Sequence, residues 1–428
     1  MRKNGNIEAD RDSTPQRLCV LDSVRGVAAL IVVIHHCLLT LPAFSDYFFS
    51  TWRTSASGVF QTIMFDTPGR VLWAGFEAVT LFYVLSGLVL ALPWIQGRPP
   101  RYDTFAIKRI CRIYLPYLVT MAIASALAAA CSSSMNIAGM SRWFSQWGWS
   151  NNITGVVLLD AAVMGGAYNF INGAVHSLIW ELRVSVIFPL LVWPIVRWRL
   201  RGAAVVMTVL VGIFAVARRL EYGSFAPAGA NPGSGVLANV GFIAYYATFF
   251  VLGIVIALNL TPLRRWMTAL RGPARAGLLA TGLGIMMTHW TRMNLVQALV
   301  VGIGASIVLI AALSPGRIER VLSLQPLRWL GKISYALYLI HLPLLLVSVV
   351  ALHGILPHAV ILILVPFVSI ALAWLFNEWV IEPSVKLGNT LARMWLSAFA
   401  PVKQGEPLFE SSLTGSVADS PDVVNQRR

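Results

Sequence analysis

The chain has 428 residues, of which 57% are hydrophobic and 12% are charged. Soluble domains carry about 25% charged residues, so this composition excludes an ordinary soluble domain and predicts a polytopic membrane protein. The formal net charge of +15 does not indicate a nucleic-acid partner, because the cations fall mainly in segments between apolar runs. The four cysteines show neither CxxC spacing nor clustering, so we expect no disulfide framework and no metal site.

Apolar runs long enough to span a bilayer recur along most of the chain. Nine of them are long and a tenth, 276–289, is shorter, which together predict an all-α protein with about ten transmembrane helices. The long runs are 24–41, 77–95, 113–131, 178–196, 203–217, 241–259, 296–313, 333–352 and 359–381.

The distribution of basic residues predicts how these spans are oriented. With the amino terminus inside, most of the 33 Lys and Arg residues fall in cytoplasmic segments, as the positive-inside rule requires. Both termini are then cytoplasmic. The predicted organisation is a polar N-terminal segment at 1–17, a ten-helix membrane domain at 18–387, and a cytoplasmic, disordered tail at 388–428.

The outer segment 132–177 is long and apolar in part. Its tryptophans are expected to form an interfacial belt, and a platform for an apolar or sugar ligand is the alternative. They are Trp143, Trp147 and Trp149. Residues 153–166 are apolar but carry Asp160, and a further full span there would invert every later loop. We therefore expect this segment to be re-entrant or to lie at the membrane surface.

The first apolar run, LDSVRGVAALIVVIHHC (21–37), contains two adjacent histidines. On a helix, Arg25 and His36 are about three turns and about 16 Å apart on nearly the same face, whereas His35 is rotated by about 100°. We expect Arg25 at the cytoplasmic surface, His36 near the middle of the membrane and His35 as a packing residue. An ionisable group at that depth is costly, so His36 is a site candidate; the alternative is an imidazole that a neighbouring helix satisfies.

Two arginines enter the third span within KRICRIYLPY (108–117). Arg109 and Arg112 are three residues apart and therefore neighbours on one helical face, on the same membrane side as Arg25. Three guanidinium groups there can bind a phosphorylated ligand bidentately. The alternative is ordinary positive-inside charge in contact with lipid phosphates.

The second span, GFEAVTLFYVLSGLVLAL (75–92), carries Glu77 at its outer end and Ser86 near its middle. Glu77 is a candidate site residue, and snorkelling at the interface is the alternative. Ser86 and the following glycine can contact a substrate or allow close helix packing.

The fourth span opens with AVHSLIWELRVSVIFPLL (174–191), which places His176, Glu181 and Arg183 near the outer interface. Glu181 and Arg183 are two residues apart, so we expect them to face different partners. A carboxylate about one turn into the membrane is costly unless it is paired or faces a wet cavity. Glu181 is therefore the second site candidate after His36.

Two polar groupings occur near the end of the membrane domain. GKISYALYLIHLPLL places Ser334, Tyr338 and His341 at spacings of four and three, which forms a single stripe on a spanning helix. The last span ends in FNEWVIEP, where we expect Glu382 to pair with a loop cation rather than to act in catalysis.

Taken together, these stretches resemble the membrane-bound acyltransferase-3 family of O-antigen, exopolysaccharide and macrolide O-acyltransferases. The resemblance covers roughly residues 17–385. It rests on six motifs in family order, which are LDSVRGVAALIVVIHH, FEAVTLFYVLSG, KRICRIYLPY, HSLIWELRVSVIFP, ISYALYLIHLPLL and the closing ExP. Glu77 stands where many members have Asp, and His176 replaces the usual Trp, which puts the identity of the acceptor in doubt.

The resemblance implies ten core helices and a cytoplasmic site for acyl-CoA, with acetyl-CoA as the expected donor and no metal. The acceptor would be a hydroxyl of a carbohydrate or lipid-linked glycan, so the implied process is O-acetylation in polysaccharide modification. The implied location is a bacterial inner membrane, with membrane lipids as further partners.

The family's patterns also imply roles for individual residues. Its Arg-x10-His pattern maps onto Arg25 and His36, its Arg-x-x-Arg pattern onto Arg109 and Arg112, and the Glu of its fourth-span motif onto Glu181. We expect His36 to be the general base or an acylated relay, and the three arginines to hold the CoA phosphates. Glu181 is the second catalytic candidate and shapes the acceptor end of the site together with Glu77. The other expected substrate contacts are Ser86, His176, Tyr338 and His341.

A second class of function fits the same composition. A transporter or exporter of an anionic or acylated metabolite would also have ten spans and buried ionisable residues. Against it stand the absence of a convincing internal repeat and the clustering of basic residues at one mouth.

Overall fold

The computed structural model describes residues 5–49, 58–131, 135, 137–149, 153–166, 170–222, 235–288 and 295–399, without the side chains of 5–18, 221 and 222. These residues form helices and no strand, so the all-α prediction is confirmed. The long helices are α1 (Gly5–Leu39), α4 (Gly75–Ile95), α5 (Tyr102–Cys131), α8 (His176–Tyr222), α9 (Val236–Leu258), α12 (Leu295–Ala312), α14 (Gln325–Leu352), α15 (His358–Phe376) and α16 (Glu382–Ala398).

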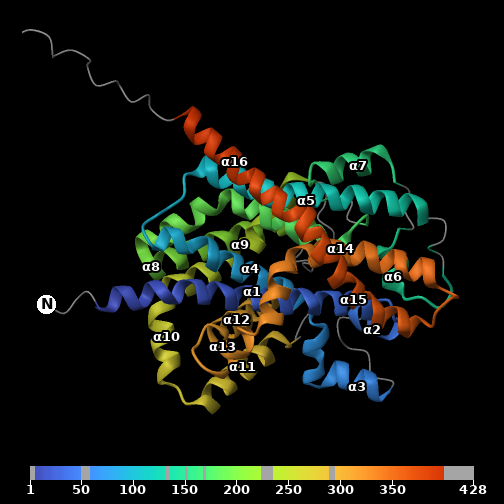
Figure 1. Ribbon diagram of the computed structural model, residues 1–428, viewed down its shortest axis with the longest axis horizontal. Helices are drawn as coiled ribbons and strands as arrows, with labels where there is room; N and C mark the ends of the chain where they lie inside the picture. The colour runs from blue at the N-terminus through green and yellow to red at the C-terminus, as the bar shows by residue number, and fades with distance from the viewer. Residues whose placement is uncertain are drawn as a thin grey trace, which may run out of the picture.

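Shorter elements lie between these helices and at the two ends of the bundle (Figure 1). They are α2 (Pro42–Phe49), α3 (Val59–Asp66), η1 (Pro68–Trp73), α6 (Arg142–Trp147), α7 (Gly155–Ala162), η3 (Gly173–Val175), α10 (Leu260–Ala269), α11 (Gly272–Met286), α13 (Arg317–Leu322) and the π-helical turn η4 (Asn377–Ile381). Elements α2, α3, α6 and α7 gather at one end of the bundle, and α10 lies at the other, where α1 begins (Figure 1).

Eight helices of the described chain are long and apolar enough to cross a membrane. One of these, Gly173–Leu220, is 48 residues long and contains two of the predicted runs. Helix α11 has 15 residues and matches the short tenth run. Counting both arms of α8 and adding α11 reproduces the predicted ten apolar segments.

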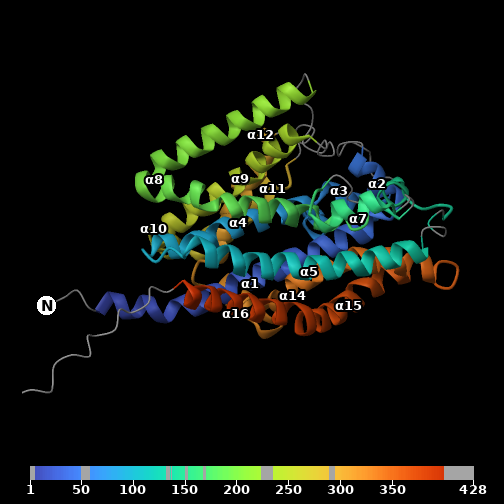
Figure 2. The same ribbon diagram turned by 90° about the horizontal axis from the view of Figure 1, so that it is seen from above.

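Helix α8 reverses direction at Arg199, whose φ of 56° lies in the left-handed region. Gly202 follows the turn, and a Cβ atom there would lie 2.2 Å from the carbonyl oxygen of Pro194. Only glycine permits this close approach of the two backbones. The two arms therefore form a helical hairpin, which opens away from the turn in Figure 2.

A close helix crossing fixes α1 against α14. A Cβ atom on Gly26 would lie 2.6 Å from the backbone nitrogen of Gly331, and one on Gly331 would lie 2.3 Å from the carbonyl oxygen of Asp22. Backbones this close form the small-residue type of contact common between membrane helices. The crossing brings the first histidine-containing run beside the Ser334–His341 stripe of α14.

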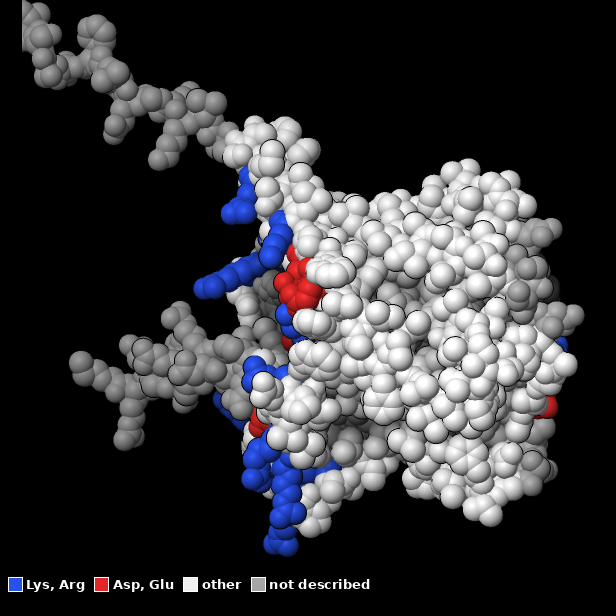
Figure 3. Space-filling view, turned by 45° about the vertical axis from the view of Figure 1, so that its right-hand side comes forward, with Lys and Arg blue, Asp and Glu red and all other residues white. Residues whose placement is uncertain are grey.

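The two ends of the bundle differ in charge. The described chain begins and ends at the same end of the bundle, where α1 starts and α16 finishes (Figures 1 and 2). On the face shown in Figure 3, most Lys and Arg side chains gather at this end, and the broad middle of the molecule is free of charge. This is the pattern expected of a bilayer-spanning bundle with one basic face.

Two predicted boundaries differ from the structure. Residues 388–398, predicted as the start of a disordered tail, form the second half of α16, which packs on α5 through Gly388 and Cys111. The amphipathic sequence of α16 buries its small residues against α5, and this tertiary contact was not visible in the composition. At the other end of the chain, α1 begins at Gly5, so most of the polar segment 1–17 is continuous with the first span.

The described residues of the segment 132–177 fold over one end of the bundle rather than forming a belt toward lipid (Figure 1). Trp143 is 4% exposed and Trp149 is 1% exposed, so the prediction of an interfacial belt is wrong for both. Trp149 donates its indole N–H to the carbonyl oxygen of Ile171 over 2.8 Å. A buried indole that finds such a partner packs as core.

The segment 153–166 is re-entrant or superficial, as predicted, since α7 has only 8 residues. Its last residues are held by the middle of α5, because the hydroxyls of Tyr114 and Tyr117 donate to the carbonyl oxygens of Ala162 and Ala161 over 2.6 and 2.7 Å.

Candidate active site

A pocket of about 670 Å³ opens between α1, α4, α5, α8 and α14. It brings together six of the ten residues that the sequence singled out. They are Arg25, Ser86, Arg109, Arg112, Glu181 and Tyr338. Five helices, most of them far apart in sequence, contribute a charged or hydroxyl group to the same space, so the polar residues of the spans are gathered rather than scattered.

The centre of the pocket wall is an ion pair between α5 and α8. Arg109 donates to Glu181 over 2.7 Å and to the hydroxyl of Ser185 over 3.1 Å. Ser86 of α4 donates to the same Glu181 oxygen over 3.0 Å. The Arg109 and Glu181 side chains remain 15% and 21% exposed, so the pair borders open space and is accessible to a ligand.

Glu181 lines this pocket and Glu77 does not, so the structure does not bring the two carboxylates together at one cavity. Glu181 is about one and a half turns inside α8, and the long Arg109 side chain reaches it from the opposite end of α5. The carboxylate is paired and faces a cavity, which are the two conditions under which it is tolerated within a membrane. As predicted, Arg183 faces elsewhere and donates to Asn239 and to the carbonyl oxygens of Met164 and Gly165.

Arg25 and Arg112 complete the basic side of the pocket. Arg25 is 24% exposed and lies 3.5 Å from Asp22, which is itself 50% exposed. Arg25 is six residues inside the apolar stretch Cys19–Leu39, so its guanidinium reaches the pocket from the second turn of that stretch.

A histidine pair lies beyond the Tyr338 end of the pocket. The ring of Tyr338 is 5.8 Å from that of His341, and the ring of His341 is 5.0 Å from that of His36. The two imidazoles are in hydrogen-bond contact, with 3.2 Å between His341 Nε2 and His36 Nδ1. Tyr338 thus connects the arginine pocket to the histidine pair, although neither imidazole lines the pocket itself.

The two adjacent histidines of α1 have different environments. His35 is 4% exposed, stacks on Trp73 and contacts the carbonyl oxygen of that residue through Nδ1 over 2.6 Å. His36 is only half-buried and lies beside Trp143 and His341. The prediction that His35 is a packing residue agrees with this geometry.

His36 lies only three residues before Leu39, the last residue of α1. His36 is therefore close to the end of α1 that packs against Trp143 of α6.

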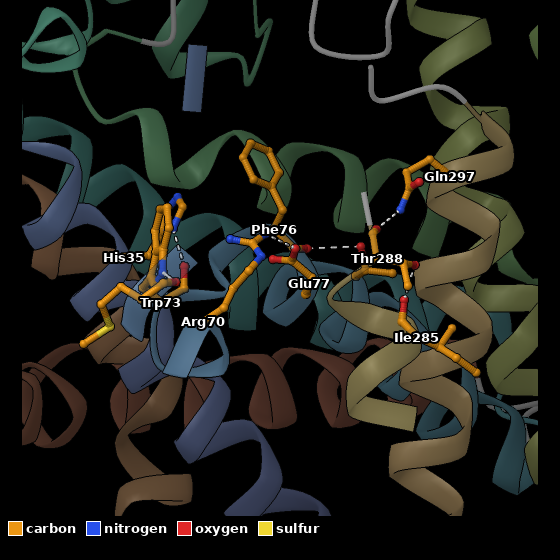
Figure 4. A network of polar contacts seen from close by, with 10 residues as sticks. His35, Arg70, Trp73, Phe76, Glu77, Ile285, Thr288 and Gln297 are labelled. Carbon is orange, nitrogen blue, oxygen red and sulfur yellow. Dashed lines mark hydrogen bonds and ion pairs between the residues drawn. The ribbon is translucent and has the colours of Figure 1, made fainter. Parts of the chain in front are cut away.

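Glu77 is fully buried outside the pocket. It lies at the end of the bundle where α2, α3, α6 and α7 gather, which we call the cap (Figure 1). It pairs with Arg70 of η1 over 2.8 Å, and the two side chains are 2% and 4% exposed. Figure 4 shows the two side chains pointing toward one another, with His35 and Trp73 to one side. The predicted substrate contact thus belongs to a buried ion pair and is not part of the pocket lining.

His176 also lies outside the pocket lining. Its Nε2 accepts a hydrogen bond from the indole N–H of Trp180 over 3.0 Å, and Trp180 in turn stacks on Tyr246. The structure therefore shows His176 among aromatic side chains and not in the pocket lining.

Sequence reasoning missed several polar residues of the pocket. Tyr335, Ser177 and Tyr83 line it. Tyr335 is three residues before Tyr338, so the spacing that defined the α14 stripe could have found it. The others depend on contacts between helices. Within the described ranges, no group of three or more His, Cys, Asp or Glu side chains is arranged to hold a metal ion.

The sequence matches the family described as Acyltransferase domain over residues 20–378, which is nearly the whole chain. The chain belongs to this acyltransferase-3 family. It is therefore a multi-pass membrane acyltransferase of the O-acyltransferase type, and nothing in the match supports the transporter alternative. No curated protein and no solved structure matches the chain.

Proposed function

We propose that this acyltransferase moves an acyl group, with acetyl as the group to test, from acyl-CoA to a hydroxyl of a carbohydrate or lipid-linked glycan. The observation that carries the proposal is the arginine pocket with the His36–His341 pair beyond its Tyr338 end. The gathering of basic side chains at one end of the bundle supports a cytoplasmic location for that end and for both termini (Figure 3). A bacterial inner membrane is the compartment that the proposal implies.

The pocket suits the nucleotide end of the donor. Arg25, Arg109 and Arg112 line one cavity, and guanidinium groups bind phosphates through paired, charge-assisted hydrogen bonds. Glu181 orients Arg109 and the Ser86 hydroxyl on the pocket wall. The acyl end of the donor would then extend toward Tyr338 and the histidine pair.

The histidine end supplies the acid–base chemistry. In the proposed step, His36 accepts the proton of the acceptor hydroxyl while the hydroxyl oxygen forms a bond to the thioester carbonyl carbon. The tetrahedral oxyanion then collapses, the carbon–sulfur bond breaks, and the departing thiolate takes the proton from His36. The products are free CoA and the O-acyl acceptor.

The test uses purified protein in proteoliposomes with radiolabelled acetyl-CoA and an extract of membrane glycolipids. The wild-type protein should release CoA and transfer label to the extract, and His36→Ala should lower turnover by about 10²-fold or more. Binding of acetyl-CoA by calorimetry should persist in the variant, because the three arginines are unchanged. Wild-type turnover by His36→Ala would contradict the assignment of the base, and label that crosses the membrane without covalent change would contradict the enzyme.

A further inference from the structure

The orientation of the base in the proposed function depends on a second histidine. We propose that His341 is a positioning residue, which holds His36 in the tautomer that carries its proton on Nδ1 and leaves Nε2 free to act as the base. The inference rests on the proposed function for its catalytic consequence, but the tautomer itself is a property of the protein alone.

The first step of the argument is the tautomer of His341. Its Nδ1 lies 2.9 Å from the carbonyl oxygen of Tyr338 and 3.1 Å from that of Leu337. Both oxygens can only accept hydrogen bonds, so Nδ1 must carry the proton. A neutral imidazole has one protonated nitrogen, and Nε2 of His341 is therefore an acceptor.

The second step of the argument is the position of the proton on His36. Its Nδ1 faces Nε2 of His341 over 3.2 Å and the carbonyl oxygen of Val32 over 2.9 Å. Both partners are acceptors, so Nδ1 of His36 must be the donor. The opposite tautomer would place lone pairs against each other in both contacts of His36.

The third step is that His341 cannot easily turn away. It is 1% exposed, whereas His36 is half-buried. Two residues further along α14, Pro343 lacks the N–H that would bond the carbonyl oxygen of Leu339. The amide of Asn172 donates to that oxygen over 2.9 Å, and Asn172 is itself fully buried. The backbone around His341 is thus tied to the segment that precedes α8.

In this arrangement His36 is the base and His341 is the group that orients it. In such assemblies the partner selects the tautomer and accepts the hydrogen bond that strengthens as the base becomes charged. His341 does both without contacting the pocket directly. His35 is close to His36 but uses its Nδ1 on Trp73, so it does not share the role.

The experiment begins with the wild-type protein, labelled with ¹⁵N at histidine and held in nanodiscs. The ring nitrogens of His36, assigned by their loss in His36→Asn, should show a protonated Nδ1 and an unprotonated Nε2. A protonated Nε2 on neutral His36 would overturn the proposal. Because no substrate is needed, this measurement stands even if the proposed function fails.

Turnover provides the second readout. His341→Leu removes the acceptor and should lower kcat for CoA release from acetyl-CoA by roughly 10- to 100-fold, with KM for acetyl-CoA within about twofold. His341→Gln retains an acceptor oxygen and should recover most of the loss. The matched control is His358→Leu, because His358 of α15 bonds Thr40 just past the end of α1 rather than either histidine of this pair; its kcat should be unchanged.

Each outcome separates the two claims. Wild-type kcat in His341→Leu would overturn the positioning role and leave the acyltransferase proposal intact, as would a Gln variant no better than the Leu variant in correctly folded protein. If the wild-type protein releases no CoA with any acceptor extract, the proposed function fails, and the ¹⁵N spectrum alone then decides the tautomer.

Discussion

Two arginine–glutamate pairs of nearly equal length occupy opposite kinds of site in this molecule. Arg109 and Glu181 are 2.7 Å apart, and Arg70 and Glu77 are 2.8 Å apart. The first pair is 15% and 21% exposed and lines the pocket, whereas the second is 4% and 2% exposed and lies beneath the cap. Burial rather than distance separates a pair that is open to a ligand from a pair that holds two segments together.

The surroundings of the two pairs support the same distinction. Glu181 also accepts a hydrogen bond from Ser86, and Arg109 also donates one to Ser185. Two hydroxyl groups therefore orient the pair that lines the pocket. Arg70 instead lies 5.2 Å from the centre of the Trp73 ring, against the helix end that carries Glu77. A family pattern identifies both glutamates, but it does not say which one faces a ligand.

The largest expected effect is on stability, from removing one charge of the buried pair. Glu77→Gln should lower the free energy of unfolding by about 3–5 kcal/mol, because the Arg70 guanidinium loses its carboxylate partner in a dry environment. The measurement is the thermal unfolding transition of the protein in detergent, together with the yield of folded protein. Replacing both partners, as Arg70→Met with Glu77→Leu, should recover most of the loss, since neither charge then remains buried. A double variant no more stable than Glu77→Gln would contradict a structural role for the pair.

The next effect should appear in turnover rather than in stability. Glu181→Gln keeps the shape of the side chain but removes the charge that orients Arg109 and accepts from Ser86. We expect kcat for CoA release to fall by about 10²-fold, with a change in unfolding free energy below about 1 kcal/mol, because the pair is partly solvated. A variant that loses stability as Glu77→Gln does would remove the difference between the two pairs.

A smaller effect should follow from changing the geometry of the pocket cation while keeping its charge. Arg109→Lys retains a positive charge but loses the planar fork that can bond a phosphate and Glu181 together. KM for acetyl-CoA should rise by about tenfold, with kcat changed less. Arg101→Lys is the matched control, because Arg101 pairs with Asp103 at the exposed start of the same helix and should leave both constants unchanged. Equal effects of the two substitutions would indicate general electrostatic attraction rather than a specific contact.

The sequence predicted the spans and the family motifs well, because hydropathy and charge report directly on contact with lipid and water. It predicted helix ends less well. The third run was expected to start at 113, but α5 starts at Tyr102, since a helix continues through its charged end after hydropathy has fallen.

Pairing between helices was the least predictable feature. Helical spacing grouped Ser334, Tyr338 and His341 correctly on one stripe, but it gave no reason to expect that His341 would contact His36. That contact depends on the Gly26–Gly331 crossing, which juxtaposes α1 and α14. Similarly, Glu77 and Glu181 looked alike in sequence because Arg70 and Arg109, which distinguish them, are supplied by other segments of the chain.

The smallest effect should come from the solvent-exposed ion pairs of Lys332. Lys332 lies 2.8 Å from Glu382 and 3.0 Å from Glu378. Glu382 thus pairs with a cation, as predicted, but Lys332 belongs to α14 rather than to a loop, and its side chain is 54% exposed. Exposed pairs contribute about 0–1 kcal/mol and are screened by salt. Lys332→Gln should therefore shift the unfolding free energy by less than about 1 kcal/mol and leave CoA release unchanged, and raising the salt concentration should reduce even this difference. If the variant instead destabilised the protein as much as Glu77→Gln, the π-helical turn that carries Glu378 would have to depend on this lysine. The burial of an ion pair would then not determine how much it contributes to the free energy of unfolding of this protein.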